Sequence, residues 1–313
     1  MHKLSAAFLV VLGLLVASCA GDDAAAPDTT AATESDASGT DANDTGTDAA
    51  ETVDLSLTRD DVDCSPEWIS SDEETFTTAH VVVDGVLGAP CLGDVDDTLL
   101  EAWEALTVIA PTLALADLGL FGGFTGDPDS EEVTLAFVNA LDDDGTLFQM
   151  SINLDAYRDD ADQSYLTMAH EFSHVFTQLP SQLDRSDEAG DECVTYFNGD
   201  GCFYDDSLMA QYIYEFWPDE LLAELPAPDV GATVESGEER CQLNAEFLGP
   251  YAASNPEEDF AETFSAFVFE LSVDPALDDK LEWMAAQPGL AEFRDRAIDA
   301  GLTPLGNPFE QCG

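Results

Sequence analysis

The chain has 313 residues, of which 66 are acidic and only 8 are lysine or arginine, giving a formal net charge of −58 at pH 7. A field of this sign repels nucleic acid and anionic lipid head groups, which excludes both as partners held by charge. Repulsion within the chain should also destabilise the fold at low ionic strength. Two explanations of the acidity stay open, namely a saline habitat and the attraction of basic substrates.

Residues 1–19 have the pattern of a bacterial export signal. A short basic start at Lys3 precedes an apolar run, residues 6–16, which is too short to span a membrane. The segment ends in VASC and resembles the lipobox of bacterial lipoproteins, in which the cysteine, here Cys19, is lipidated and becomes the mature N-terminus. We therefore expect a lipid-anchored protein of the bacterial cell envelope, with its domain outside the cytoplasm. The alternative is an ordinary cleaved signal with an incidental cysteine.

Residues 20–61 consist mainly of Ala, Asp, Thr, Ser and Gly. Such a composition cannot bury enough apolar surface to fold, so we expect a disordered acidic tether. The remainder, residues 62–313, is long enough for one domain with a sizeable core.

The cysteines agree with export. If Cys19 carries the lipid, six cysteines remain, and an even set in an exported chain indicates three disulfides. Proximity along the chain favours the pairs Cys64–Cys91, Cys193–Cys202 and Cys241–Cys312. Only the middle pair has local support, because FNGDG between its cysteines is typical of a tight turn. A structural zinc on cysteines is less favoured because the chain has no C-x₂-C pair.

The first half of the domain contains the sheet-forming segments. Residues 75–86 predict a strand, in which we interpret His80 as structural. Residues 95–117 have helical spacing, although Pro111 must kink or split the helix. Two β-rich runs then follow, joined by DDDGT, and together they predict a hairpin over residues 133–157. A calcium site at the three aspartates is the alternative, but EF-hand spacing is absent.

The segment MAHEFSHVFTQ contains His-Glu-x-x-His, with His170, Glu171 and His174 in the required places. On a helix, residues four apart share a face, so both imidazoles can reach one metal ion while Glu171 projects toward its bound water. This is the layout of a zinc hydrolase. The alternative is a core helix whose histidines only make hydrogen bonds. By analogy between folds, a mixed sheet before this helix predicts an α+β, zincin-like domain with a mostly antiparallel sheet.

A catalytic zinc site needs a third protein ligand, which we seek downstream. A third histidine six residues after the second is excluded because Pro180 stands there. The best candidate is NPEEDFAETF, where Asn255 suits a helix N-cap and Pro256 the first helical position. Glu258 and Glu262 share a face, so one can bind the metal while the other accepts a hydrogen bond from a ligand imidazole. The alternatives are that Glu258 only caps the helix and that Glu262 is a solvated carboxylate.

Together, the His-Glu-x-x-His motif and the pattern Tyr-x₆-Glu-x₃-Glu, which begins at Tyr251, resemble the catalytic domain of anthrax toxin lethal factor and related bacterial zinc-peptidase lipoproteins, within the gluzincins. The resemblance implies that both histidines and Glu258 bind zinc and that Glu171 is the general base. It also implies that Glu262 supports the ligands and that Tyr251 stabilises the oxyanion. The chain departs from the pattern of this family in the long acidic stretch at about residues 181–246. We expect this stretch to be an inserted, cysteine-bearing subdomain that walls the cleft, with a helix near residues 207–216.

The sequence therefore predicts a zinc metallopeptidase with one zinc ion per chain, which hydrolyses peptide bonds through a zinc-activated water with Glu171 as base. We expect a peptide or protein substrate to lie along an exposed strand, residues 147–157, by β-addition. Membrane contact is expected through the N-terminal lipid only, and nucleic acid is not an expected partner. Two alternatives stay open: a non-catalytic binding or adhesion lipoprotein stabilised by a metal, and a cell-wall amidase.

Overall fold

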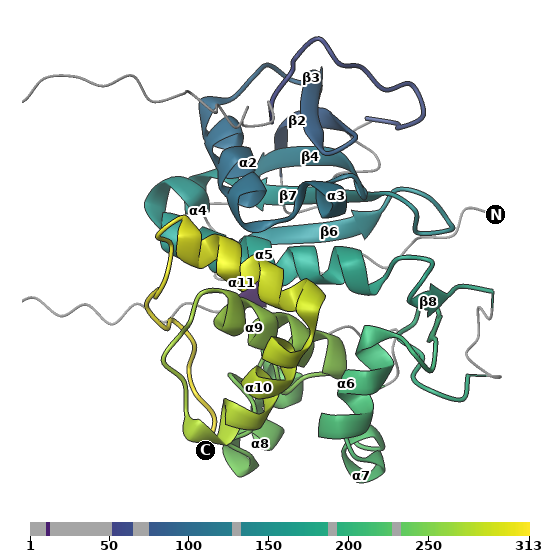
Figure 1. The fold of residues 1–313 in the computed structure, drawn as a ribbon, viewed down its shortest axis with the longest axis vertical. Coiled ribbons are helices and arrows are strands. Elements are labelled where there is room, and N and C mark those ends of the chain that lie inside the picture. Colours follow the sequence, from purple (N-terminus) through teal and green to yellow (C-terminus); the bar gives the residue numbers. More distant parts are fainter. Residues whose placement is uncertain (1–10, 13–51, 65–74, 127–132, 187–192, 227–232) are drawn as a thin grey trace, which may run out of the picture.

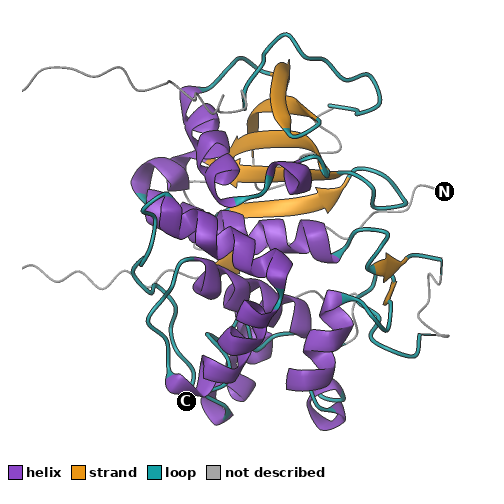
Figure 2. Ribbon diagram, in the orientation of Figure 1, coloured by secondary structure: helices purple, strands orange, loops and turns teal. Residues whose placement is uncertain are grey.

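The computed structural model describes residues 11–12, 52–64, 75–126, 133–186, 193–226 and 233–313. Within these ranges the protein has an α+β fold with a mixed, mostly antiparallel main sheet, which confirms the predicted fold class. The sheet and its neighbouring helices form the upper half of the molecule in Figure 1, and further helices form the lower half. Figure 2 shows that the strands of the main sheet are confined to the upper half.

Five strands form the main sheet: β2 (Thr75–Val83), β3 (Val86–Leu92), β4 (Leu118–Thr125), β6 (Ala136–Ala140) and β7 (Phe148–Asn153). Their order is β3-β2-β4-β7-β6, and only β4 and β7 run parallel. Asp84 and Gly85 join β2 to β3 with φ values of 50° and 79°, the left-handed conformation of a type I′ hairpin turn. The predicted strand over residues 75–86 therefore ends at Val83 and turns back.

The predicted hairpin forms between β6 and β7, and Asp142 holds its turn by accepting a hydrogen bond from the Thr146 backbone N–H at 2.8 Å. The predicted strand over residues 147–157 is shorter than expected, because Asn153 ends β7 and caps helix α4 (Leu154–Asp159). The Asn153 side chain accepts hydrogen bonds from two backbone N–H groups of the first turn, which favours helix over continued strand.

Pro111 splits the predicted helix over residues 95–117 into α2 (Asp97–Ile109) and α3 (Thr112–Leu115), as its missing N–H and fixed φ require. Trp103 on α2 is fully buried, and its indole N–H donates to the Thr52 carbonyl at 2.8 Å.

The folded part begins before the predicted boundary. The Leu87 backbone N–H in β3 donates to the Thr52 carbonyl at 3.0 Å, and Val53 forms a parallel bridge with Leu87. Residues 52–61, expected in the tether, thus include a segment that backbone pairing fixes despite its few apolar side chains. The rest of the predicted tether and signal segment, including Cys19, lies outside the described residues except for strand β1.

Strand β1 (Val11–Leu12) pairs with β5 (Val133–Thr134). Among the described helices, none combines the length and the apolar character that crossing a membrane requires.

Helix α5 (Ala161–Thr177) lies between the two halves of the molecule (Figure 1). Asp160 caps it by accepting a hydrogen bond from the Gln163 backbone N–H at 3.0 Å. The helix contacts β6 and β7 on the sheet side and α9 (Pro256–Val268) on the other side. Because both sides are covered, nearly the whole second half of α5 is buried.

The lower half is helical and surrounds α9. Helix α9 contacts α5, α6 (Leu208–Phe216), α10 (Asp278–Ala286) and α11 (Pro288–Asp299). The remaining elements are short or peripheral: β8 (Leu183–Asp184), β9 (Cys202–Phe203), α7 (Asp219–Leu222), α8 (Val234–Leu243) and the 3₁₀ helix η2 (Pro275–Leu277).

The described part of residues 181–246 packs against the rest of the domain through helix α6. Its helix α6 buries Met209, Tyr212 and Ile213 in the same core as the apolar face of α9. These side chains thus find their apolar partners in the main domain, and the insertion of this stretch stays a prediction.

Within the described part of the chain, three disulfides are present, and they join the pairs that proximity along the chain favours. Cys64 is bonded to Cys91, with Cα atoms 5.9 Å apart, and this bond ties the N-terminal segment to β3. The other two bonds join Cys193 to Cys202 and Cys241 to Cys312. The last of them fixes the C-terminal segment to α8.

Candidate metal centre

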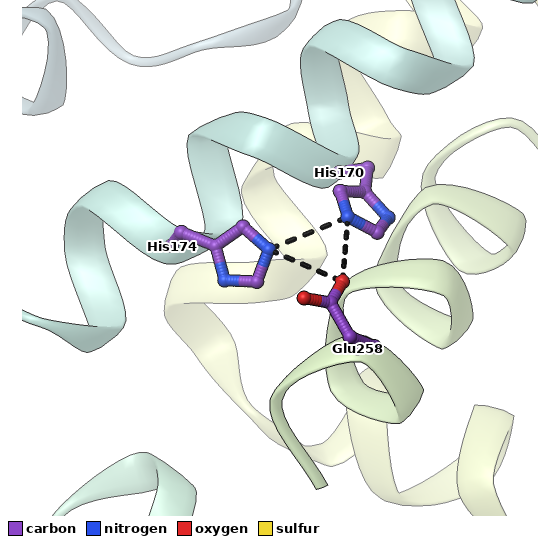
Figure 3. A group of neighbouring side chains, drawn as sticks. All are labelled: His170, His174 and Glu258. Carbon is purple, nitrogen blue, oxygen red and sulfur yellow. Dashed lines mark hydrogen bonds and ion pairs between the residues drawn. The ribbon is translucent and has the colours of Figure 1, made fainter. Parts of the chain in front are cut away.

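Helix α5 places both motif histidines on one buried face. His170 and His174 are 5% and 4% exposed, and their Nε2 atoms lie 3.3 Å apart. The spacing of four residues brings the rings together because an α-helix completes a turn in 3.6 residues. Figure 3 shows the two imidazoles converging on one point beside the helix.

The third member of the centre comes from the start of α9. Asn255 caps this helix by accepting a hydrogen bond from the Glu258 backbone N–H at 2.9 Å, and Pro256 occupies its first turn, as the sequence predicts. Glu258 is fully buried, and its Oε2 lies 3.0 Å from Nε2 of His170 and 3.6 Å from Nε2 of His174. The three potential ligand atoms all lie within 4.8 Å of one another (Figure 3).

These distances fit a zinc ion. With Zn–N and Zn–O bonds near 2.0–2.1 Å, a tetrahedral site has neighbouring ligand atoms about 3.4 Å apart. The three observed separations are 3.0, 3.3 and 3.6 Å, which scatter around that value. Two imidazoles and one carboxylate are a donor set that zinc hydrolases use, with the fourth position left for water or substrate. The group thus has the layout of a zincin.

The charges of the three groups are coupled. Burial lowers the pKa of His170. At His174, burial acts in the same direction, but the nearby Glu258 carboxylate outweighs it and raises the pKa to about 9. Burial also opposes ionisation of Glu258, yet the two histidines hold its pKa well below the ordinary value. A proton on His174 and a metal ion would compete for the same imidazole nitrogen, so metal binding should weaken as pH falls.

Glu171 lies beside the centre and is fully buried. Neither of its carboxylate oxygens has a hydrogen-bond partner among the described residues. Burial is the main cause that raises its pKa to about 8, with a smaller opposite effect from His174. A buried carboxylate with both oxygens unused is suited to exchanging protons with a bound substrate or water.

Tyr251 also lies at the centre. It is 3% exposed, and its ring centroid is 6.1 Å from that of His170. Burial, followed by the charges of Glu258, Glu171 and Glu262 and a hydrogen bond with Glu258, raises the pKa of its hydroxyl well above the ordinary value. The phenol is therefore protonated at all physiological pH values and can donate a hydrogen bond.

Glu262 lies one helical turn after Glu258 and is 2% exposed. It lines a small cavity together with His170 and with Phe309 from the C-terminal segment. Its carboxylate accepts a hydrogen bond from the Ala252 backbone N–H, while burial and the nearby carboxylates raise its pKa well above the ordinary value. The predicted hydrogen bond to a ligand imidazole stays a prediction.

Sequence reasoning missed Glu257, which precedes the proposed ligand. Glu257 is 4% exposed, and its carboxylate accepts a hydrogen bond from the Tyr196 hydroxyl. Burial raises its pKa to about 8. In a sequence this acidic, nothing distinguishes Glu257 from the many solvated carboxylates around it.

A buried ion pair behind the ligand helix was also missed. Nζ of Lys280 lies 2.7 Å from both carboxylate oxygens of Asp259, which also accepts hydrogen bonds from the Tyr212 hydroxyl (3.0 Å) and the Trp217 indole N–H (2.8 Å). The sequence does contain a signal for this ion pair, since Lys280 is one of only two lysines in the chain.

His80 lies outside this group, in β2, where it is fully buried and its Nδ1 is 2.8 Å from the Gly88 carbonyl oxygen. Strand β7 is covered on both sides by β4 and β6, so the strand expected to receive a substrate is not an edge. Among the described strands of this sheet, β6 is the edge next to α5.

Comparison with known proteins gives little further information. No protein-family model matches the chain, and no curated protein matches it significantly. A solved structure from Bacteroides caccae, described as a "putative zinc-binding metallo-peptidase", resembles it with a TM-score of 0.27 and 14% sequence identity. The match covers 64% of this chain and 66% of that chain, just under two thirds of its length. A likeness this weak decides neither fold nor function.

Proposed function

We propose that this protein is an exported, lipid-anchored zinc metallopeptidase that hydrolyses peptide bonds. The observation that carries the proposal is the convergence of His170, His174 and Glu258 within 4.8 Å, with the unbonded carboxylate of Glu171 beside them. A pair of core histidines that only make hydrogen bonds would need neither a carboxylate from another helix nor a second carboxylate without hydrogen-bond partners beside it.

His170, His174 and Glu258 would hold one zinc ion per chain. When bound, zinc acts as a Lewis acid that polarises the scissile carbonyl and lowers the pKa of a water molecule toward about 7. Glu258 is well prepared to bind the ion, because its pKa is held low and its carboxylate is charged in the buried site.

Glu171 is the proposed general base. Its carboxylate accepts a proton from the attacking water and later donates that proton to the leaving amine. Tyr251 is the proposed oxyanion donor, since its hydroxyl stays protonated and lies near the centre. These roles are also those that the resemblance to lethal factor and other gluzincins implies.

The substrate is proposed to be a peptide in extended conformation that adds to β6. This strand is the edge next to the helix that carries the base, so a peptide paired with it would pass close to Glu171. The lipid on Cys19 would keep the domain at the outer face of the cell envelope, where extracytoplasmic proteins and peptides are the available substrates.

The test is cleavage of a mixed peptide library by the zinc-loaded full-length protein, read by mass spectrometry. Glu171→Gln keeps the size of the side chain and removes the base, so we expect zinc to be retained and cleavage to fall by at least about 100-fold. Glu292→Gln, the same change at an exposed position on α11, should leave cleavage unchanged. Glu171-independent cleavage would contradict the mechanism. No cleavage of any peptide by zinc-loaded protein would favour the binding-lipoprotein or cell-wall amidase alternatives.

A further inference from the structure

A small disulfide-closed loop places a tyrosine beside the ligand helix. Cys193 and Cys202 are bonded, and Tyr196 lies between them. The loop is fixed from within, because the Phe203 backbone N–H donates to the Tyr196 carbonyl at 3.1 Å and the two rings lie nearly parallel. The Asn198 side chain accepts two further backbone hydrogen bonds at its turn. The Tyr196 main chain is thus held on both sides.

The side chain of Tyr196 packs against the core and donates its hydroxyl hydrogen to the Glu257 carboxylate. Glu257 is 4% exposed, and its second oxygen, Oε2, has no hydrogen-bond partner among the described residues. The carboxylate also accepts a hydrogen bond from the backbone N–H of Glu257 itself, so Tyr196 supplies the bond that ties it to another segment of the chain. The bond joins two segments that are distant in the sequence.

Glu257 stands directly before the proposed ligand Glu258 in the first turn of α9. It also interacts electrostatically with both Glu258 and His174. The Asn255 cap holds the beginning of this turn, and Asp259 on the far side of it is held by Lys280, Tyr212 and Trp217. The bond from Tyr196 to Glu257 adds a constraint from the disulfide-closed loop.

We propose that Tyr196 is a positioning residue for the metal centre: its hydrogen bond to Glu257 holds the first turn of α9 so that Glu258 meets the two histidines of α5. The inference rests on the proposed function only in requiring that this centre binds zinc. Outer residues that orient metal ligands typically change metal affinity by about 10- to 100-fold when they are removed. The disulfide-closed loop thereby serves the centre although none of its residues is a ligand.

The test is the zinc affinity of the full-length protein, measured by competition with a chromogenic chelator in high salt at constant pH. Tyr196→Phe removes only the hydroxyl, and we expect zinc binding to weaken about tenfold or more. Tyr214→Phe is the matched control, because Tyr214 is 59% exposed and its hydroxyl donates to the exposed Asp205 at 3.0 Å. The control should bind zinc like the wild type.

A double-mutant cycle tests whether Tyr196 acts through Glu257. Glu257→Gln keeps an oxygen that accepts the hydrogen bond, so Tyr196→Phe should still weaken zinc binding in that background. Glu257→Ala removes the acceptor, so Tyr196→Phe should there cause no further loss. An unchanged zinc affinity in Tyr196→Phe, or an equal loss in the Glu257→Ala background, would overturn this inference alone. Absence of zinc binding in the wild-type protein would overturn the proposed function as well.

Discussion

Oε2 of Glu258 lies 3.0 Å from Nε2 of His170, although the two residues belong to different helices. About 80 residues separate the end of α5 from the beginning of α9. Removing a carboxylate and two imidazoles from water costs free energy unless their charges are paired or they share a metal ion. The meeting of α5 and α9 at this point is therefore the feature that the proposed chemistry requires.

Replacing the carboxylate ligand tests that relationship. We expect Glu258→Ala to weaken zinc binding more than about 100-fold, beyond the range for residues that only orient ligands, because one of three ligands is lost. The measurement is a competition titration against a chelator. Glu239→Ala, at an exposed position on α8, is the control and should leave affinity unchanged. Equal affinities of the two variants would remove Glu258 from the ligand set.

Tyr251 provides a second test, directed at turnover. Tyr251→Phe keeps the buried ring and removes the donor, so we expect kcat to fall about 100-fold, the usual loss for one oxyanion-hole hydrogen bond. KM should change much less, because the interaction is made chiefly in the transition state. Tyr204→Phe, at a 40% exposed position, serves as the control. A kcat equal to that of the wild type would exclude Tyr251 from catalysis.

The buried ion pair behind α9 predicts a large effect on stability. Lys280→Met leaves Asp259 buried without its counter-ion, so we expect the free energy of unfolding to fall by about 3–5 kcal/mol. Arg158→Met is the matched control, because its ion pairs with Asp96 and Asp155 are largely exposed and should contribute only about 0–1 kcal/mol. Urea unfolding measures both. A similar decrease in the free energy of unfolding in the two variants would show that the buried Lys280–Asp259 pair contributes no more to stability than the exposed pairs.

Buried carboxylates predict how the metal-free protein responds to pH. Burial raises the pKa of Glu171 and of Glu257 from 4.5 to about 8. The unfolded chain releases these protons near pH 4.5, whereas the folded protein retains them up to about pH 8. The unfolded state therefore binds fewer protons between these pH values, and the free energy of unfolding should fall as pH rises through this window.

Urea unfolding of chelator-treated protein at about pH 5 and pH 8 tests this expectation, in high salt so that surface repulsion is screened. The double variant Glu171→Gln, Glu257→Gln has no such protons to release and should depend less on pH. If the free energy of unfolding depended equally on pH in the two proteins, the raised pKa values of Glu171 and Glu257 would be refuted.

Much of the centre is predictable from sequence because its signals are local. The spacing of His170 and His174 fixes their shared helix face, and the Asn-Pro start of α9 fixes Glu258 within the first turn. The split at Pro111 and the hairpin turn at Asp142 follow from local backbone chemistry in the same way. Each of these features depends on a few neighbouring residues.

The missed features depend on contacts between distant segments. Nothing near Thr52 in the sequence indicates that its carbonyl will pair with β3 and accept from Trp103. Likewise, the neighbours of Glu257 do not reveal a tyrosine from the disulfide-closed loop. The identity of the edge strand depends on the order of the whole sheet, which the alternation of residues along one strand does not determine.

The most direct test of the central claim is the zinc content of the full-length protein, purified under oxidising conditions, dialysed in high salt with zinc and then freed of loosely bound metal. The account predicts one zinc ion per chain in the wild type and none in His170→Ala. A folded wild-type protein that retains no zinc would contradict it, and the His-Glu-x-x-His helix would then be a structural helix of the core.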